Sequence, residues 1–227
     1  KVEKASPFAA GSCTLATFAF PNDTEFDASK STVQGMWNLT EGWILSEDGK
    51  SKLTANPATD FSYRYEAKGS SDAEGTKDHV RVCVKSMKLG GYWLFEVPVT
   101  DAPAGKVNFS FNQSASAAGP NYFLVEFSTD GTNWTPVGAQ TTTESWTKDS
   151  APTTSEVTWT YALNRNGVNA ANVAYPVNVT VDVPALSGNN TLYFRTTVSS
   201  TIAFSSAREV GAGYNRIWGP CVVTWSK

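Results

Sequence analysis

Aromatic side chains stand beside polar donors near the end of this sequence. The stretch from Tyr214 to Trp218 reads Tyr-Asn-Arg-Ile-Trp, which joins two rings to an amide and a guanidinium. Sugars stack their apolar faces on such rings, while planar donors bind their hydroxyl groups. Eight tryptophans are also many for 227 residues, and not all of them can lie in a core. The sequence therefore predicts a ligand surface at Tyr214, Asn215, Arg216 and Trp218, with Trp146 as a neighbour.

One feature of the sequence supports this predicted surface, and one alternative opposes it. Gly211 and Gly213 precede it and let the backbone bend around a ligand. The alternative is that Ile217 and Trp218 alternate into the core, which would leave only Tyr214 and Arg216 outside.

Two glutamates form a second candidate site. Glu96 shares a strand face with Tyr92, and Glu126 shares one with Tyr122. If their strands are neighbours, the two carboxylates flank a groove, as in retaining glycoside hydrolases, where the pair lies about 5–5.5 Å apart. The surrounding residues match no glycosidase signature, so a jelly-roll hydrolase using Glu96 and Glu126 is kept as an alternative.

Histidine chemistry is largely excluded. His79 is the one histidine of the chain, and a Ser-His-Asp triad would have to use it. No Gly-x-Ser-x-Gly, His-Glu-x-x-His or Walker A motif occurs. We expect His79 to begin a strand and to take no part in function.

The charge balance excludes other classes of partner. The formal net charge is -3 and no basic run occurs, so nucleic acid and anionic membrane surfaces are poor partners. No stretch reaches the roughly 18 consecutive apolar residues of a membrane span. The low charge, with many Ser, Thr, Asn and Trp residues, favours a protein that works outside the cytoplasm.

The cysteines and the start of the chain say little about processing. Cys13, Cys83 and Cys221 allow at most one bridge, and we expect three buried thiols. A bridge between Cys13 and Cys221 is the alternative. The first residues contain no apolar signal segment, and the missing initiator methionine favours a trimmed mature form or a recombinant product. Residues 1–11 are expected to be a loose leader.

The elements that must position these residues are β-strands. Apolar residues alternate with a period of two over many short segments separated by Gly, Pro, Asn, Asp and Ser. The predicted strands are 14–20, 32–37, 61–66, 79–85, 92–97, 106–112, 122–128, 133–137, 156–161, 176–183, 191–199 and 215–225. Helical patterns are weak, at 27–36 and 164–174, and 141–154 is expected to be a long polar loop. Many strands without helices indicate a β-sandwich or barrel.

Residues 122–137 predict a hairpin. The segment alternates on both sides of Asp130-Gly131, a pair that supplies the positive φ angles of a type I′ turn. Trp134 is then expected to pack across the hairpin.

The order of these segments resembles galactose-binding-like jelly rolls. In that family a strand ending in Ser-x-Asp-Gly-x-x-Trp, here from Ser128 to Trp134, precedes a Leu-Tyr-Phe-Arg strand, here Leu192 to Arg195. The stretch 91–99, followed by Pro-Ala-Gly at 103–105, is similar to surface lipoprotein domains of Bacteroidetes. Asp149-Ser-Ala is similar to the site that those bacteria O-glycosylate. The resemblance covers roughly 60–227, so extra strands are expected within 14–66.

The expected protein is one all-β jelly-roll sandwich over residues 12–227. The resemblance implies a non-catalytic carbohydrate-binding or adhesion module of a bacterial surface protein, with a glycan as its partner. It is expected at the cell exterior or outer-membrane surface, anchored by a removed N-terminal segment. A purely structural surface module is a further alternative.

A structural calcium ion fits the same resemblance. Jelly rolls often hold one with loop carboxylates, and Asp23, Asp27, Asp48 and Asp60 lie in the N-terminal loops. Their spacing matches no EF-hand, so no metal ligand is assigned.

Overall fold

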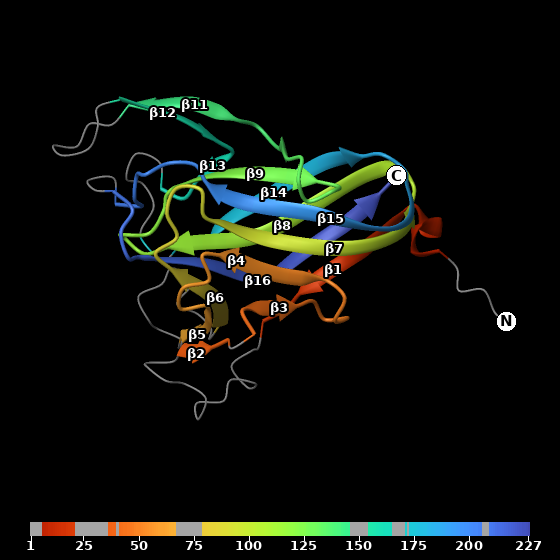
Figure 1. Ribbon diagram of the computed structural model, residues 1–227, viewed down its shortest axis with the longest axis horizontal. Helices are drawn as coiled ribbons and strands as arrows, with labels where there is room; N and C mark the ends of the chain where they lie inside the picture. The colour runs from red at the N-terminus through yellow and green to blue at the C-terminus, as the bar shows by residue number, and fades with distance from the viewer. Residues whose placement is uncertain are drawn as a thin grey trace.

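Two stacked antiparallel sheets form the protein (Figure 1). The computed structural model describes residues 6–20, 36–39, 41–66, 79–145, 154–164, 171, 173–205 and 209–227. The elements are η1 (Pro7–Ala10), β1 (Ser12–Phe18), β2 (Met36–Asn38), β3 (Trp43–Leu45), β4 (Lys52–Asn56), β5 (Ser62–Glu66), β6 (His79–Lys85), β7 (Tyr92–Ala102), β8 (Gly105–Ala115), β9 (Tyr122–Ser128), β10 (Thr135–Pro136), β11 (Thr141–Ser145), β12 (Thr154–Trp159), β13 (Tyr161–Ala162), β14 (Tyr175–Val183), β15 (Leu186–Val198) and β16 (Tyr214–Ser226). The all-β prediction is confirmed, and β1 to β5 are the additional N-terminal strands.

The strand order is that of a jelly roll. The first sheet runs β14-β8-β16-β6-β5-β2, with β1 paired to the C-terminal half of β16. The second sheet runs β10-β9-β15-β7-β4-β3, with β13 paired to the start of β9. The chain changes sheet at each step from β6 to β9 and again from β14 to β16. Successive strands therefore face each other across the core.

Phenylalanines from both sheets meet in that core. Phe109 of the first sheet lies with its ring centroid 4.6 Å from Phe95 and 5.0 Å from Phe194, both on the second sheet. All three side chains are fully buried. Burying one such ring stabilises the fold by roughly 1.5–3 kcal/mol. The period-2 alternation of each strand turns these phenylalanines toward the core.

A polar network crosses the same core. Asn215 Oδ1 accepts hydrogen bonds from Trp93 Nε1 at 3.0 Å and from Gln113 Nε2 at 2.7 Å. Tyr161 donates its hydroxyl hydrogen to Gln113 Oε1 and lies 2.5 Å from Thr196 Oγ1. Burial raises the pKa of Tyr161 well above 10, so its phenol stays neutral. Since β7, β8, β13, β15 and β16 each contribute one residue, the network joins the two sheets.

The two ends of the described chain lie together. Phe8 of η1 is buried, and its ring lies edge-on to Trp225 at 4.9 Å. The backbone N–H of Lys227 donates to the carbonyl of Gly11 at 2.9 Å. Part of the expected loose leader, Pro7–Ala10, is thus docked by one aromatic contact. Residue 12 as the domain boundary stays a prediction.

One predicted loop contains strands. Thr141–Ser145 pairs with Thr154–Trp159 as a separate two-stranded sheet, where we expected a polar loop over 141–154. Threonine favours extended backbone, and the polar composition hid that preference. A second small core holds this pair against β9, with Tyr122 and Trp159 at 5.6 Å. The predicted helices at 27–36 and 164–174 fall largely outside the described residues.

The prediction of three buried thiols is confirmed for Cys83 and Cys221 and is wrong for Cys13, which is half-buried. All three cysteines are free, and two of them, Cys83 and Cys221, are buried. Cys13 of β1 is paired with Trp225 of β16. Cys221 of β16 is paired with Phe18, which lies five residues after Cys13 on β1, so the two cysteines are not opposite each other. In the described part of the chain, no helix is long and apolar enough to cross a membrane.

Candidate functional site

The outer face of the second sheet brings half-buried rings and charged side chains together. Strand register places Trp43, Thr54, Leu94, Arg195 and Glu126 in one row across five strands. The flanking rows contain Lys52, Glu96, Tyr193 and Ser128 on one side, and Asn56, Tyr92, Thr197 and Leu124 on the other. The period-2 alternation brings these side chains to one face while their neighbours fill the core. We call this face the aromatic face.

An ion pair lies at the centre of the aromatic face. Arg195 Nε donates to Glu126 Oε2 at 2.6 Å, and its NH2 group donates to Oε1 at 3.0 Å. Thr197 adds a hydroxyl donor to Oε2 at 2.8 Å. The side chains of Arg195 and Glu126 are 23% and 11% exposed. The second terminal nitrogen of the guanidinium makes none of these bonds to Glu126 and remains a planar donor in a fixed position.

Two rings contact this guanidinium from neighbouring elements. The central carbon of Arg195 lies 4.0 Å from the ring centroid of Trp134 and 5.6 Å from that of Tyr92. Trp134 also packs edge-on against Tyr193 at 6.4 Å. Tyr92 is on β7 and Trp134 follows β9, so Arg195 on β15 lies between them. Such contacts stabilise each pair by roughly 0.5–2 kcal/mol and fix the rings on the sheet.

Trp134 is held by the turn before it, which is not the predicted type I′ hairpin. Gly131 has φ 72°, but Asp130 does not have a positive φ. The Asp130 carboxylate instead accepts the backbone N–H groups of Thr132 and Asn133 and the amide of Asn133. These bonds hold the pKa of Asp130 far below its usual value. The Ser-x-Asp-Gly-x-x-Trp motif therefore builds a longer capped loop, which places Trp134 over β15.

The far end of the aromatic face carries a further ring, which is exposed. Trp43 on β3 is 41% exposed, and Lys52 Nζ lies 5.1 Å from its ring centroid. Between this ring and the centre, Asn56 donates its amide to the Tyr92 hydroxyl at 3.3 Å. Three strand steps separate Trp43 from Arg195, or roughly 14 Å at about 4.8 Å per step. Stacking rings and donors are thus spread along a line across the strands.

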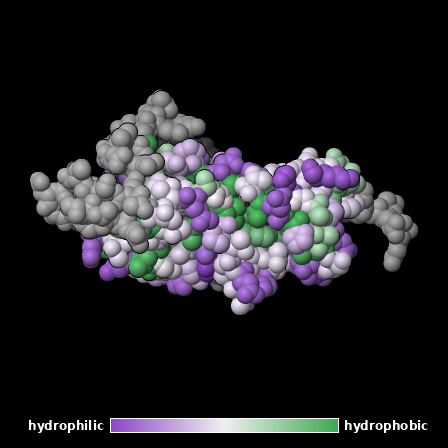
Figure 2. Space-filling view, turned by 90° about the horizontal axis from the view of Figure 1, so that it is seen from above, coloured by the Kyte–Doolittle hydropathy of each residue, from purple (hydrophilic) through white to green (hydrophobic). Residues whose placement is uncertain are grey.

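Exposed apolar surface elsewhere is scattered. Among the described residues the large exposed hydrophobic side chains are Trp43, Leu45 and Leu89. Figure 2 shows small hydrophobic patches interspersed with hydrophilic ones on the side seen from above.

The glutamate pair shares this face but is not adjacent. Glu96 on β7 and Glu126 on β9 are separated by β15, with Tyr193 and Arg195 between them. Two strand steps correspond to about 10 Å, and the residues also lie in different rows. That separation exceeds the carboxylate spacing of about 5–5.5 Å in retaining glycosidases. Glu126 is moreover held by Arg195 and Thr197.

The predicted surface at 214–218 does not form as one unit. Asn215 points into the core, as described above, while Tyr214, Arg216 and Trp218 lie on the outer face of the first sheet. Arg216 and Trp218 are 3% and 6% exposed, and the Trp218 ring packs against Arg81 at 4.8 Å. Residues 214–218 alternate in the sequence as a strand does, and β16 begins at Tyr214, so the expected loop is a strand that is buried on both faces from Asn215 to Trp218.

Several other predicted positions lie outside the described residues. They are Trp146, Asp149-Ser-Ala and the carboxylates Asp23 and Asp27. His79 begins β6 as expected. Among the described residues no group of three or more His, Cys, Asp or Glu side chains could hold a metal ion. Asp48 and Asp60 each face a lysine, Lys50 at 3.8 Å and Lys85 at 3.9 Å.

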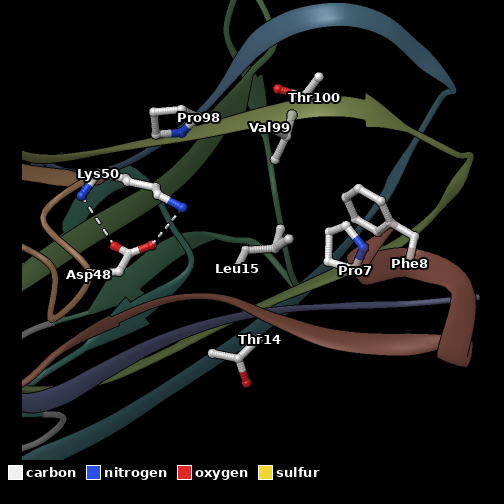
Figure 3. Close-up of a pocket in the computed structure, with 9 residues that line it drawn as sticks. All are labelled: Pro7, Phe8, Thr14, Leu15, Asp48, Lys50, Pro98, Val99 and Thr100. Carbon is white, nitrogen blue, oxygen red and sulfur yellow. Dashed lines mark hydrogen bonds and ion pairs between the residues drawn. The ribbon is translucent and has the colours of Figure 1, made fainter. Parts of the chain in front are cut away.

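A groove of about 420 Å³ opens between β1 and β7, beside the turn from β3 to β4 (Figure 3). Its lining is Pro7, Phe8, Thr14, Leu15, Asp48, Lys50, Pro98, Val99 and Thr100. Asp48 accepts from Ser46 Oγ at 2.6 Å, and this bond lowers the pKa of Asp48. The one ring in the lining, Phe8, is 7% exposed, so the groove offers no stacking surface.

Sequence analysis missed the centre of the aromatic face. Alternation through Leu192 to Val198 does place Tyr193, Arg195 and Thr197 on one side. What no local pattern showed is that β15 lies between β7 and β9, so that Tyr92 and Glu126 become neighbours of Arg195.

Comparison with known proteins gives structural likenesses only. No family model and no curated protein matches the chain. The K1 cleaved adhesin domain of Lys-gingipain from Porphyromonas gingivalis W83 aligns over 82% of this chain and 94% of its own length, at 14% identity and a TM-score of 0.37. The CBM22-1 xylan-binding domain of Xyn10C from Paenibacillus barcinonensis aligns over 96% and 97%, at 11% identity and a TM-score of 0.35.

The bacteriophage CBA120 tailspike protein 4 enzymatically active domain also matches, at 11% identity and a TM-score of 0.34. The alignment covers 86% of this chain but 21% of that one, so this chain spans about a fifth of its length. Because identities and scores are this low, function has to be inferred from the chain's own residues.

Proposed function

We propose that this protein is a non-catalytic module that binds a carbohydrate chain on the aromatic face. The observation that carries the proposal is the arrangement of Trp134, Arg195 and Tyr92, two rings on either side of a guanidinium fixed by Glu126. Rings supply stacking area for pyranose faces, and the donor orients hydroxyl groups beside them. Trp43, at the other end of the face, would contact a further unit of the same chain.

Preorganisation supports binding over hydrolysis. Glu126 already accepts three hydrogen bonds from Arg195 and Thr197, which suits a residue that positions a donor. Glu96 lies two strands away, too far for the paired chemistry described above. The aromatic face is also an open sheet surface, suited to a chain that runs across it.

The test is calorimetric titration with a panel of soluble polysaccharides and oligosaccharides. Trp134→Ala and Tyr92→Ala should each weaken binding of any hit by about tenfold or more, equal to roughly 1.4 kcal/mol, since each removes a stacking surface. Tyr214→Ala is the matched control, because it removes a half-buried ring from the outer face of the other sheet. Unchanged affinity in the first two variants would exclude the aromatic face, and a loss in Tyr214→Ala alone would move the site to β16.

The setting of this function belongs to the same proposal. Polysaccharides are met outside cells, and the lipoprotein resemblance of residues 91–105 supports a bacterial surface protein. Protease treatment of intact cells of the source organism, followed by detection of the chain, tests that location. A chain protected until the cells are lysed would contradict it.

A further inference from the structure

The edges of the two main sheets differ sharply in length. The edge strands β2, β3 and β10 contain three, three and two residues, so they offer few backbone groups to a neighbouring strand. β14 ends the first sheet with nine residues, Tyr175–Val183, in unbroken register with β8 (Figure 1). β1 also forms a local edge, but a bulge interrupts it between Thr14 and Ala16.

Proline marks which backbone groups of β14 face outward. In an edge strand proline is tolerated where its nitrogen points away from the neighbouring strand. The backbone groups of Pro176 therefore point away from β8. Because the register is unbroken, the N–H and C=O groups of Asn178, Thr180 and Asp182 point the same way. Among the described residues, no backbone bond from another segment reaches β14 on that side.

The side chains of this edge leave it unprotected. Edge strands usually carry lysines, prolines, bulges or inward charges that discourage pairing, and in β14 the proline, Pro176, precedes the segment from Val177 to Val183. Here the one charged residue, Asp182, is matched by Lys106 of β8, whose Nζ lies 2.7 Å from Oδ1. Asn178 and Thr180 lie flat on the outer face because Asn108 donates to both, at 2.5 and 3.0 Å. In the part of the chain that the structure describes, these contacts leave the edge accessible from the side.

We infer that β14 is a self-association edge, and that its partner is β14 of a second copy, paired antiparallel about Thr180. The sequence from Val177 to Val183, Val-Asn-Val-Thr-Val-Asp-Val, reads the same in both directions in its alternation of valine and polar residues. About Thr180, every valine meets a valine and every polar residue meets a polar residue. Inner and outer faces therefore continue across the pair.

Hydrogen bonding and charge fit this register. Asn178, Thr180 and Asp182 point both backbone groups outward and are opposite one another, so each completes an antiparallel hydrogen-bonded pair. Asn178 of one copy faces Asp182 of the other, and Thr180 faces Thr180, both favourable cross-strand pairs. A parallel in-register pair would instead place Asp182 beside Asp182. The two-fold arrangement also closes, which excludes fibre growth through this edge.

Burial supplies a further reason for association. Val177, Val179 and Val183 are buried within the protomer, but Val181 is only half-buried. Antiparallel pairing about Thr180 places Val179 of the second copy opposite Val181 and covers it. The contact involves one strand from each copy, so we expect a weak dimer that dissociates on dilution.

The experiment is sedimentation velocity of the whole chain over a wide range of concentration. Wild type should pass from monomer to dimer, and Thr180→Lys, which sets lysine against lysine on the two-fold axis, should weaken dimerisation by about tenfold or more. Thr224→Lys is the matched control, since Thr224 lies two strands inward in the same row, on the same face. It should leave the dimer unchanged.

Amide exchange provides an independent readout. The amides of Thr180 and Asp182 should become protected as wild-type concentration rises, whereas those of Val179 and Val181, bonded to β8, should not change. A wild type that is monomeric throughout overturns the inference. So does a dimer that survives Thr180→Lys, or one that both lysine variants weaken equally. Glycan affinity measured on dilute monomer is unaffected by any of these outcomes, so the two proposals fail separately.

Discussion

At the scale of single residues, the aromatic face depends on one arginine with several partners. Arg195 pairs with Glu126 through two nitrogens and also contacts Trp134 and Tyr92. Lysine would keep the charge but cannot make a two-pronged bond or present a planar face to a ring. The consequence should appear in binding more than in folding, because the pair is partly exposed.

We therefore expect Arg195→Lys to weaken binding of a glycan hit by about tenfold or more while lowering stability by only about 1 kcal/mol. The measurements are calorimetric titration and urea denaturation. Lys106→Arg, at an exposed ion pair of the first sheet, is the control and should change neither. An Arg195→Lys variant that binds like wild type would show that Arg195 does not touch the ligand.

A glycine fixes the ring next to that arginine. Gly131 has φ 72°, and a Cβ added there would lie 3.2 Å from the Tyr193 ring. Gly131→Ala should cost roughly 1–2 kcal/mol through the left-handed backbone alone. It should also displace Trp134 and so weaken glycan binding. Gly188→Ala is the control for backbone strain, since its φ is 71° with no atom within 4 Å. Equal effects of the two substitutions on binding would contradict this role of the turn.

At the scale of elements, the positions of most strands could be predicted from the sequence, but which strands pair with each other could not. Alternation located β6 to β9 and β14 to β16, because apolar residues recur along each of them with a period of two. It failed at β11, whose strand is polar on both faces, and at Asp130-Gly131, where the capping bonds of Asp130 outweigh the usual turn preference of the pair. The surface predicted at 214–218 depends on the same kind of contact, since which strands adjoin is decided by non-local pairing.

The buried network shows the same dependence on non-local contacts. Asn215 was predicted to bind ligand, but it accepts from Trp93 and Gln113 in the core. Asn215→Ala should lower the free energy of unfolding by about 2–5 kcal/mol, because two buried donors lose their acceptor. Asn112→Ala, on the outer face of β8, should cost less than about 1 kcal/mol. Urea denaturation of both variants measures the difference, and equal losses would contradict the network's importance.

At the scale of the whole molecule, buried phenols and thiols lower stability at alkaline pH, because burial raises the pKa of Cys83 and Cys221 as well as those of two tyrosines. Burial raises the pKa of Tyr63 to about 12 and that of Tyr161 well above 10. Unfolded tyrosines ionise at about pH 10. Above that pH the unfolded chain loses protons that the folded chain retains, which lowers the free energy of the unfolded state relative to the folded one. The stability that these residues contribute is complete below that pH and is lost as the pH rises toward 12.

Urea midpoints measured from neutral pH to about pH 12 should therefore begin to fall near about pH 9, where unfolded thiols ionise, and fall more steeply above about pH 10, where unfolded phenols do. Tyr63→Phe should show a shallower fall over the same window, because one of the raised groups is absent. Exposed Tyr residues cannot produce this difference, so an identical slope in the variant would contradict the assignment to Tyr63.

The meeting of the two chain ends also decides how the fold responds to pulling. Ser12 lies opposite Ser226, at the end of the antiparallel pair of β1 and β16 where both termini leave (Figure 1). Tension between these ends acts along the hydrogen bonds and opens the pair one bond at a time, as a zip opens. Tension on one end against a ligand on the aromatic face follows a different path, through β16 and β8 into the core. The protein would then yield at low force when stretched between its own termini and resist when held by its ligand.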